Sequence, residues 1–225
     1  MDEDQIRVAV VCGATGLTGK YLLNELLNSD CFEKVIAVVR SEFVLSHPKL
    51  ELVKVNFNNL ADFADKIKGT DYFSTLGTTL KKAGSKEEFF KTDVELVFEF
   101  AKIAKKNHAK NFYLLSSVGA DPNSKNYYLK VKGILENRVQ ELNFESLHIF
   151  RPSLLLGHRN ESRPAEKIAQ VLLPFLSFLL VGKFRKYKPI ASKILAKAIC
   201  KVAELKVESA IHHYDDIYKI HSSIF

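Results

Sequence analysis

The sequence predicts a doubly wound α/β fold, with a mainly parallel sheet, helices on both faces and a small C-terminal helical cap. Two features predict it. Over roughly the first two thirds of the 225 residues, short apolar runs alternate with segments of helical periodicity, as in repeated strand–helix–strand units. A glycine-rich stretch also follows the first apolar run, at the position where folds of this class carry a ligand-binding loop.

Six apolar runs supply the predicted strands. The first, residues 6–12, is apolar at nearly every position, which is typical of a strand buried on both faces of a parallel sheet. The other predicted strands are residues 34–39, 50–55, 71–76, 111–115 and 146–150.

The helices between these strands are predicted from apolar spacing and capping residues. Four leucines recur at helical spacing after the first strand: Leu22, Leu23, Leu26 and Leu27. Ser85 and Glu88 form a capping box that opens a helix ending near residue 106. Further helices are expected over 61–67, 126–142 and 190–205, and a short strand or helix follows the last of them.

The last third of the sequence departs from this alternation. A loop over 153–162 leads to a very apolar segment, 168–182, and then to the basic run 183–188. We expect a single domain, residues 1–225, in which residues 153–225 form a small cap or substrate region. The apolar segment could pack on the sheet or on a second copy, wall a hydrophobic substrate pocket, or lie on a membrane surface beside the basic run.

Composition and charge exclude several classes of protein. A hydrophobic fraction of 47% and a charged fraction of 26% are ordinary for a globular domain and exclude disorder. The net charge of +7 arises within residues 163–206, where ten Lys and Arg outnumber two Glu. Because this excess is local and no helix-turn-helix or zinc pattern occurs, nucleic-acid binding is not expected.

We expect a cytoplasmic protein without a metal site. The sequence begins Met-Asp-Glu-Asp, unlike a secretory signal. Its longest apolar run, residues 171–182, is much shorter than the roughly 20 residues of a membrane-spanning helix. Three widely spaced cysteines predict neither a disulfide framework nor a zinc site, and the histidines show no metal-ligand spacing.

The glycine-rich stretch has the pattern Gly-x-x-Gly-x-x-Gly between the first strand and the first helix. Glycine allows a tight turn, close approach of the backbone to a pyrophosphate, and close packing of the helix on the strand. The helix N-terminus then binds the phosphate through its free N–H groups. The sequence therefore predicts a Rossmann coenzyme loop made of Gly13, Thr15, Gly16, Leu17, Thr18 and Gly19.

The end of the second strand favours NADP(H) over NAD(H). In NAD-binding loops a carboxylate about 20 residues further on holds the ribose. Here Arg40 stands near that position, and no carboxylate precedes Glu42. A guanidinium can pair with a 2′-phosphate. The alternative is that Arg40 is a solvated arginine at a strand end and binds no ligand.

Other strand ends add candidate ligand contacts. Gly77 and Thr78 follow the fourth strand and either line the coenzyme crevice or form a simple turn. Arg151 follows the sixth strand, from which it could reach the substrate or the nicotinamide. Arg159 and Arg163 could bind an anionic substrate or form surface ion pairs.

Tyr128 and Lys132 lie one helical turn apart on the helix that follows the fifth strand. A lysine ammonium beside a phenol favours the phenolate and lowers the pKa of the phenol, which makes it a proton donor or acceptor near neutral pH. The fifth strand ends in Ser116 and Ser117, whose hydroxyls could share the crevice. An exposed tyrosine and a solvated lysine would give the same spacing by chance.

Six short motifs resemble those of the short-chain dehydrogenase/reductase superfamily, and within it the Tat-interacting-protein oxidoreductase group, an atypical branch. They are residues 76–79, 82–84, 114–121, 128–133, 150–156 and 159–164. The resemblance covers about residues 8–166 and is weak beyond them. It implies a Rossmann fold that binds NADPH.

The resemblance also implies roles for individual residues. Ser116, Tyr128 and Lys132 correspond to the catalytic triad, and Ser117 is the alternative serine or a coenzyme contact. Two further coenzyme contacts are implied for Leu76 and Asn56, and Asn56 stands where relatives often have an aspartate near the adenine.

We therefore expect an NADPH-dependent reductase of an aldehyde or ketone. Hydride passes to the carbonyl carbon, Tyr128 protonates the oxygen, Lys132 holds the ribose and Ser116 orients the oxygen. Two alternatives remain: a non-catalytic NADP(H)-binding regulatory or partner-binding module, and a nucleotide-sugar epimerase-like enzyme. The expected partners are an anionic or hydrophobic small-molecule substrate and a second copy in a homodimer, with at most peripheral membrane contact.

Overall fold

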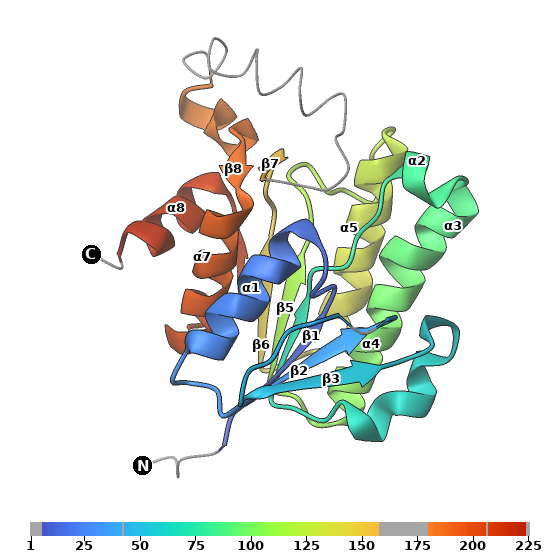
Figure 1. Cartoon of the computed structure of the whole chain (residues 1–225). Helices are drawn as coiled ribbons and strands as arrows, with labels where there is room; N and C mark the ends of the chain where they lie inside the picture. Colours follow the sequence, from blue (N-terminus) through green and yellow to red (C-terminus); the bar gives the residue numbers. More distant parts are fainter. Residues whose placement is uncertain (1–5, 42, 158–179, 206, 224–225) are drawn as a thin grey trace.

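A seven-stranded parallel sheet lies between two layers of helices (Figure 1). This computed structural model describes residues 6–41, 43–157, 180–205 and 207–223. The strand order is β3-β2-β1-β4-β5-β6-β9, and each neighbouring pair is parallel. The strands are β1 (Val8–Cys12), β2 (Lys34–Val39), β3 (Leu50–Lys54), β4 (Asp71–Ser74), β5 (Asn111–Leu115), β6 (Ser146–Phe150) and β9 (Ala210–His212).

The predicted doubly wound fold is confirmed. The chain builds the sheet outward from β1 to β3 and then returns to place β4 on the other side of β1. In open sheets of this kind, ligands bind beyond the carboxyl ends of the strands at the point where the order reverses. The carboxyl ends of β1 and β4 therefore mark the place where a ligand site is expected.

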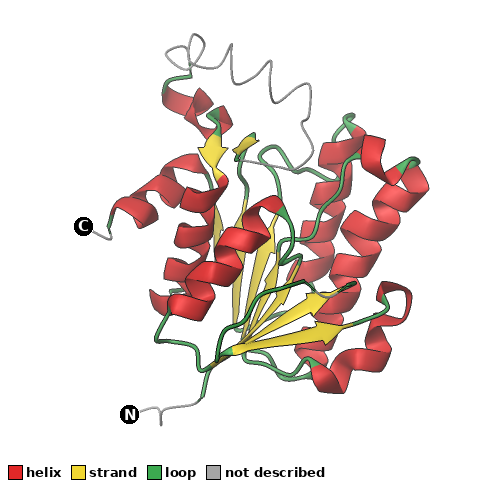
Figure 2. Cartoon of the chain, viewed as in Figure 1, coloured by secondary structure: helices red, strands yellow, loops and turns green. Residues whose placement is uncertain are grey.

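Helices cover both faces of the sheet (Figure 2). Alternate residues of β1 serve the two cores, because Val10 packs in one hydrophobic cluster and Val11 in the other. One face carries α1 (Leu17–Asn28), α7 (Ser192–Leu205) and α8 (Tyr214–Ser222). The other carries η1 (Phe57–Lys66), α3 (Lys86–Phe90), η2 (Lys91–Glu95), α4 (Leu96–Lys106) and α5 (Tyr127–Gln140), with the short α2 (Leu80–Ala83) directly before α3.

The helix predicted from the capping box contains a wider turn than expected. Ser85 caps α3, since its hydroxyl accepts a hydrogen bond from the N–H of Glu88 at 3.1 Å. The helical run then passes through η2, a π-helical turn, before it continues as α4. Such turns hold one extra residue and occur frequently at functional sites. Here the turn contains Asp93, a carboxylate that is fully buried.

The C-terminal part of the chain contributes more to the sheet than the expected cap would. The buried side of α7 packs against α1, and β9 extends the sheet by pairing with β6. A two-residue strand, β7 (Leu155–Leu156), pairs with β8 (Ile190–Ala191) where a loop was predicted. The basic run forms η3 (Gly182–Tyr187). The structure therefore places α7 and β9 in the layers of the domain.

Some expectations fall on residues that the structure does not describe. Arg159, Arg163 and residues 168–179 of the apolar segment lie outside the described ranges. Among the described residues, no helix is long and apolar enough to span a bilayer.

Candidate active site

The glycine loop joins β1 to α1 at the point where the strand order reverses. Gly13 has a φ of +92°, a conformation that strains any residue with a side chain. A Cβ on Gly13 would lie 2.7 Å from the carbonyl carbon of Thr75, the residue after β4. A Cβ on Gly19 would lie 2.0 Å from the carbonyl oxygen of Gly13. Close packing of loop, helix and β4 thus explains the glycines at both positions.

The first turn of α1 offers groups suited to an anion. Gly16 caps the helix, and its N–H donates to the Gly13 carbonyl at 2.9 Å. The Thr18 side chain is buried, and its hydroxyl has no hydrogen-bond partner among the described residues. A buried hydroxyl without a partner, together with the free N–H groups of a 12-residue helix, fits the pyrophosphate of a dinucleotide. Thr15 and Leu17 flank Gly16 in this turn.

Arg40 and Asn56 lie at neighbouring strand ends on the same edge of the sheet. The N–H of Val55 donates to the carbonyl of Val39 at 2.9 Å, which holds the ends of β2 and β3 together. Arg40 is exposed and forms no ion pair with any described residue. Asn56 caps η1, because its Oδ1 accepts from the N–H of Asn58 at 3.0 Å. Arg40 is therefore available to an anionic ligand, whereas the Asn56 oxygen already has a partner.

Lys132 is held in a buried ion pair. Its Nζ lies 2.7 Å from Oδ1 of Asp93, and the two side chains are 5% and 0% exposed. Burial lowers the pKa of Lys132, but the charge of Asp93 and the phenol of Tyr128 raise it, and the net shift is upward. Lys132 therefore carries its positive charge in the folded protein at neutral pH.

The turn after β4 is hydrogen-bonded to Asp93 and packs against the same ion pair. The N–H of Thr78 donates to Oδ2 of Asp93 at 2.8 Å. A Cβ on Gly77 would lie 3.5 Å from Oδ1 of Asp93 and 3.6 Å from Nζ of Lys132. Leu76 comes directly before this turn and is half-buried against one core. The turn predicted to line the coenzyme crevice thus lies against the predicted catalytic lysine.

Tyr128 lies on the first turn of α5 and is half-buried, with its ring centroid 5.9 Å from that of Phe89. Its hydroxyl has no hydrogen-bond partner within the described part of the chain. The neighbouring Tyr127, in contrast, donates to the carbonyl of Lys86 at 3.0 Å. Of these two adjacent phenols, only that of Tyr128 is left for a ligand.

The hydroxyl of Ser116 is bound to a carboxylate. It donates to Oε1 of Glu136, a side chain only 3% exposed, and Arg151 binds the same carboxylate with Nε at 3.1 and 3.2 Å and with Nη2. Arg151 was expected to reach the substrate or the nicotinamide; in the structure its guanidinium is paired with Glu136 instead. Ser117 is half-buried, and its hydroxyl makes only a long contact, 3.4 Å, with the carbonyl of Val118.

Sequence reasoning missed the two buried carboxylates, Asp93 and Glu136. Glu136 follows Lys132 by one helical turn and Tyr128 by two, so it lies on the same face of α5. That spacing could have shown from the sequence that Glu136 shares a helix face with Tyr128 and Lys132. Asp93 interrupts a stripe of apolar residues on its helix, which marks an inward-facing charge but does not name its partner.

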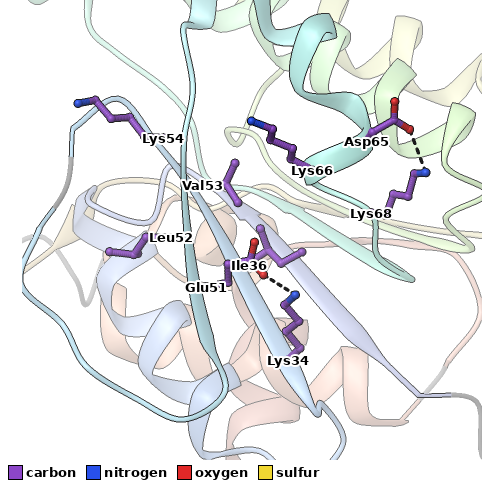
Figure 3. Close-up of a pocket in the computed structure, with 9 residues that line it drawn as sticks. All are labelled: Lys34, Ile36, Glu51, Leu52, Val53, Lys54, Asp65, Lys66 and Lys68. Carbon is purple, nitrogen blue, oxygen red and sulfur yellow. Dashed lines mark ion pairs between the residues drawn. The ribbon is translucent and has the colours of Figure 1, made fainter.

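A separate open groove of about 460 Å³ lies along the sheet edge formed by β3 (Figure 3). Its charged side chains include two ion pairs, Lys34 with Glu51 and Lys68 with Asp65. None of its lining residues is a predicted coenzyme or catalytic residue. We therefore assign the functional site to the carboxyl ends of the strands and not to this groove.

Several known proteins are similar to this chain in sequence. A family model described as NAD(P)H-binding matches residues 13–148. Protein HTATIP2 of Rattus norvegicus is 41% identical over 170 residues, which cover 74% of this chain and 70% of that protein. Protein fmp52, mitochondrial, of Emericella nidulans is 34% identical over 165 residues, 70% of this chain and 71% of that protein. The resemblance seen in the motifs is thereby confirmed.

Solved structures agree at the level of the fold. The Bordetella bronchiseptica enzyme WbmH, solved in complex with NAD+, has a TM-score of 0.71 with 17% identity, over 98% of this chain and 81% of that one. At this identity the likeness shows the fold alone.

The expectation of a cytoplasmic protein is wrong. Several fungal relatives, all FMP52 proteins, are named as mitochondrial. The expectation was based on the acidic start and the short apolar run, and neither feature excludes an organelle.

Proposed function

This chain belongs to the NAD(P)H-binding family, and we propose that it is an oxidoreductase that reduces a carbonyl compound with NADPH. One observation carries the proposal. The phenol of Tyr128, which has no hydrogen-bond partner among the described residues, lies one helical turn from the buried ammonium of Lys132, and Lys132 lies against the turn after β4. The glycine loop and this turn belong to adjacent strands, β1 and β4. A coenzyme bound at the loop would therefore extend toward the phenol.

The preference for NADP(H) is supported by Arg40. A 2′-phosphate carries about two negative charges, and a planar guanidinium can bind it with two hydrogen bonds. Arg40 is exposed at the end of β2 and, among the described residues, has no competing carboxylate partner. Asn56, on the neighbouring strand end, is neutral and would not repel the phosphate.

The protein side chains supply the proton chemistry. NADPH held by the glycine loop and Arg40 would supply the hydride for the carbonyl carbon. Tyr128 gives its phenol proton to the carbonyl oxygen, so that the alcohol leaves and the phenolate takes a proton from water. Lys132 stabilises the phenolate while it lasts, and the resemblance to short-chain dehydrogenases implies that its ammonium also holds a ribose hydroxyl.

The hydroxyl that orients the substrate is that of Ser117 in this proposal, the alternative to Ser116. A serine hydroxyl has one hydrogen, and that of Ser116 is donated to Glu136, which also pairs with Arg151. Ser116 therefore has no hydrogen to offer a carbonyl oxygen. Ser117 gives up only a 3.4 Å contact to a backbone carbonyl when it turns to a substrate.

The proposal is tested by NADPH oxidation with a panel of aldehydes and ketones. Tyr128→Phe should bind NADPH as the native protein does but lose turnover, because it has no proton to donate. Tyr127→Phe is the matched control, since it removes the adjacent phenol and only its bond to Lys86. Equal rates in Tyr128→Phe and the native protein would refute the mechanism. Tight NADPH binding without oxidation of any substrate would favour a coenzyme-binding regulatory module.

We also propose a mitochondrial location, by analogy with the names of the fungal FMP52 relatives. Subcellular fractionation of the tagged full chain tests it. Recovery with mitochondrial markers is expected, and recovery only in the cytosolic fraction would refute it.

A further inference from the structure

Asp93 is a fully buried carboxylate with two partners at the candidate active site. Oδ1 lies 2.7 Å from Nζ of Lys132, and Oδ2 accepts the N–H of Thr78 at 2.8 Å. The π-helical turn η2 carries it, so that it interrupts the apolar side of a long helical run. A buried charge is costly unless it is paired. Asp93 is paired with a group that the proposed mechanism uses.

The charge of Asp93 changes what Lys132 can do to Tyr128. A lone ammonium beside the phenol would strongly favour the phenolate. With a carboxylate at 2.7 Å from the ammonium, the negative charge of Asp93 opposes the effect of Lys132 on the phenol.

The other groups near Lys132 have partners of their own or carry no charge. Three groups act on the ammonium: Asp93 from η2, and Tyr128 and Glu136 from α5. Glu136 is neutralised by its own partner, Arg151. Asp93 is therefore the carboxylate that pairs directly with Lys132.

We propose, resting on the proposed function, that Asp93 is a positioning residue that holds Lys132 against the Gly77–Thr78 turn and weakens the stabilisation that Lys132 gives to the Tyr128 phenolate. A protonated phenol is the form that can donate to a carbonyl oxygen. A phenolate is the form that accepts a proton from an alcohol. Asp93 thus biases the resting site toward carbonyl reduction and away from alcohol oxidation.

The test is a titration of Tyr128 by its phenolate absorbance in the full-length protein. The signal of Tyr128 is the difference between each protein and the same protein carrying Tyr128→Phe. In Asp93→Asn the phenolate of Tyr128 should appear at a pH lower by about one unit or more, a tenfold change in the ionisation constant. Glu95→Gln is the matched control, because it removes an exposed carboxylate from the same turn and should change nothing.

A double variant provides a second test in case Asp93→Asn does not fold. Asp93→Asn combined with Lys132→Met removes both charges, and Tyr128 should then titrate close to its native pH. An unchanged titration in Asp93→Asn, a shift to higher pH in that variant, or a large shift in the double variant would each overturn the proposal.

The titration needs no substrate, so it separates this inference from the proposed function. A shift in Asp93→Asn without carbonyl reduction by the native protein would leave the role of Asp93 standing and refute the reductase. Reduction by the native protein without a shift in Asp93→Asn would leave the reductase standing and refute the role of Asp93. When both hold, the alkaline limb of the pH–rate profile for reduction should move to lower pH in Asp93→Asn, whereas Glu95→Gln should keep the native profile.

Discussion

Ser116 donates its hydroxyl hydrogen to Glu136, a carboxylate that is almost completely buried and bound by Arg151. The bond joins the carboxyl end of β5 to α5 inside the site. It makes Ser116 part of the supporting structure, although its position in the sequence resembles that of a catalytic serine.

The two adjacent serines should therefore respond differently to substitution. Ser116→Ala should lower the free energy of unfolding by about 1–3 kcal/mol, because a hydrogen bond to a buried charge is lost, while retaining most of the turnover. Ser117→Ala should leave stability nearly unchanged and lower the rate of NADPH oxidation by about tenfold or more. Urea unfolding and initial rates check both variants. A larger rate loss in Ser116→Ala than in Ser117→Ala would contradict the assignment.

The glycine loop should not accept a side chain at Gly19. A Cβ there would lie 2.0 Å from the carbonyl oxygen of Gly13. Gly19→Ala should therefore weaken NADPH binding by roughly tenfold or more, about 1.4 kcal/mol, as measured by coenzyme fluorescence. Gly182→Asn is the control, because Gly182 has a φ of +53°, within the range that asparagine tolerates, and open space around it. Native affinity in Gly19→Ala would argue that the coenzyme binds elsewhere.

Arg40 should determine the choice between the two nicotinamide coenzymes. Arg40→Asp should weaken NADPH binding by roughly 10- to 100-fold, the value of a charge-assisted hydrogen bond, and should strengthen NADH binding. Lys110→Asp reverses a charge just before β5, at the amino end of the strands, and should change neither affinity. If the native protein bound both coenzymes equally, the 2′-phosphate site would be refuted.

A pair of stacked histidines between β6 and β9 should make stability depend on pH. His148 Nδ1 and His212 Nε2 are 3.1 Å apart, and burial with the neighbouring ring lowers the pKa of His148 from 6.5 to about 4. Between pH 6.5 and about 4, His148 therefore binds a proton in the unfolded chain but not in the folded chain. The free energy of unfolding should fall, on the order of 2 kcal/mol, as the pH falls through this window.

Denaturant unfolding across that pH range measures the effect. His148→Gln should flatten the pH dependence, because its amide does not titrate. The exposed His108 has a φ of +58°, which asparagine accepts, so His108→Asn is a suitable control and should keep the native dependence. An equally steep loss of stability in His148→Gln would assign the effect to other groups.

The parts of the fold that local rules specify were predicted from the sequence. The bounds of β2, β5 and β6 match the predicted strands, and the glycine loop lies where its pattern placed it. In contrast, β9 has three residues, and its place in the sheet depends on pairing with β6, about sixty residues away in the chain. A strand so short and so distant from its partner leaves almost no local pattern.

The sequence named several residues of the candidate site, but it did not name the residues to which they are bonded. Tyr128, Lys132 and the Gly77 turn come together as expected. The bonds that decide their roles join Lys132 to Asp93 and Ser116 to Glu136, across different elements of the fold. Sequence spacing shows which residues share a helix face, but it does not show which buried charge will be opposite them.

The most direct test of the proposed reductase is transfer of deuterium from NADPH labelled at the reactive carbon of the nicotinamide. The native protein is incubated with the labelled coenzyme and a panel of aldehydes and ketones, and the products are analysed by mass spectrometry. The account predicts an alcohol that carries the deuterium on its former carbonyl carbon, with Tyr127→Phe giving the same product and Tyr128→Phe giving none. Saturating NADPH binding with no labelled alcohol from any substrate, or undiminished transfer by Tyr128→Phe, would contradict it.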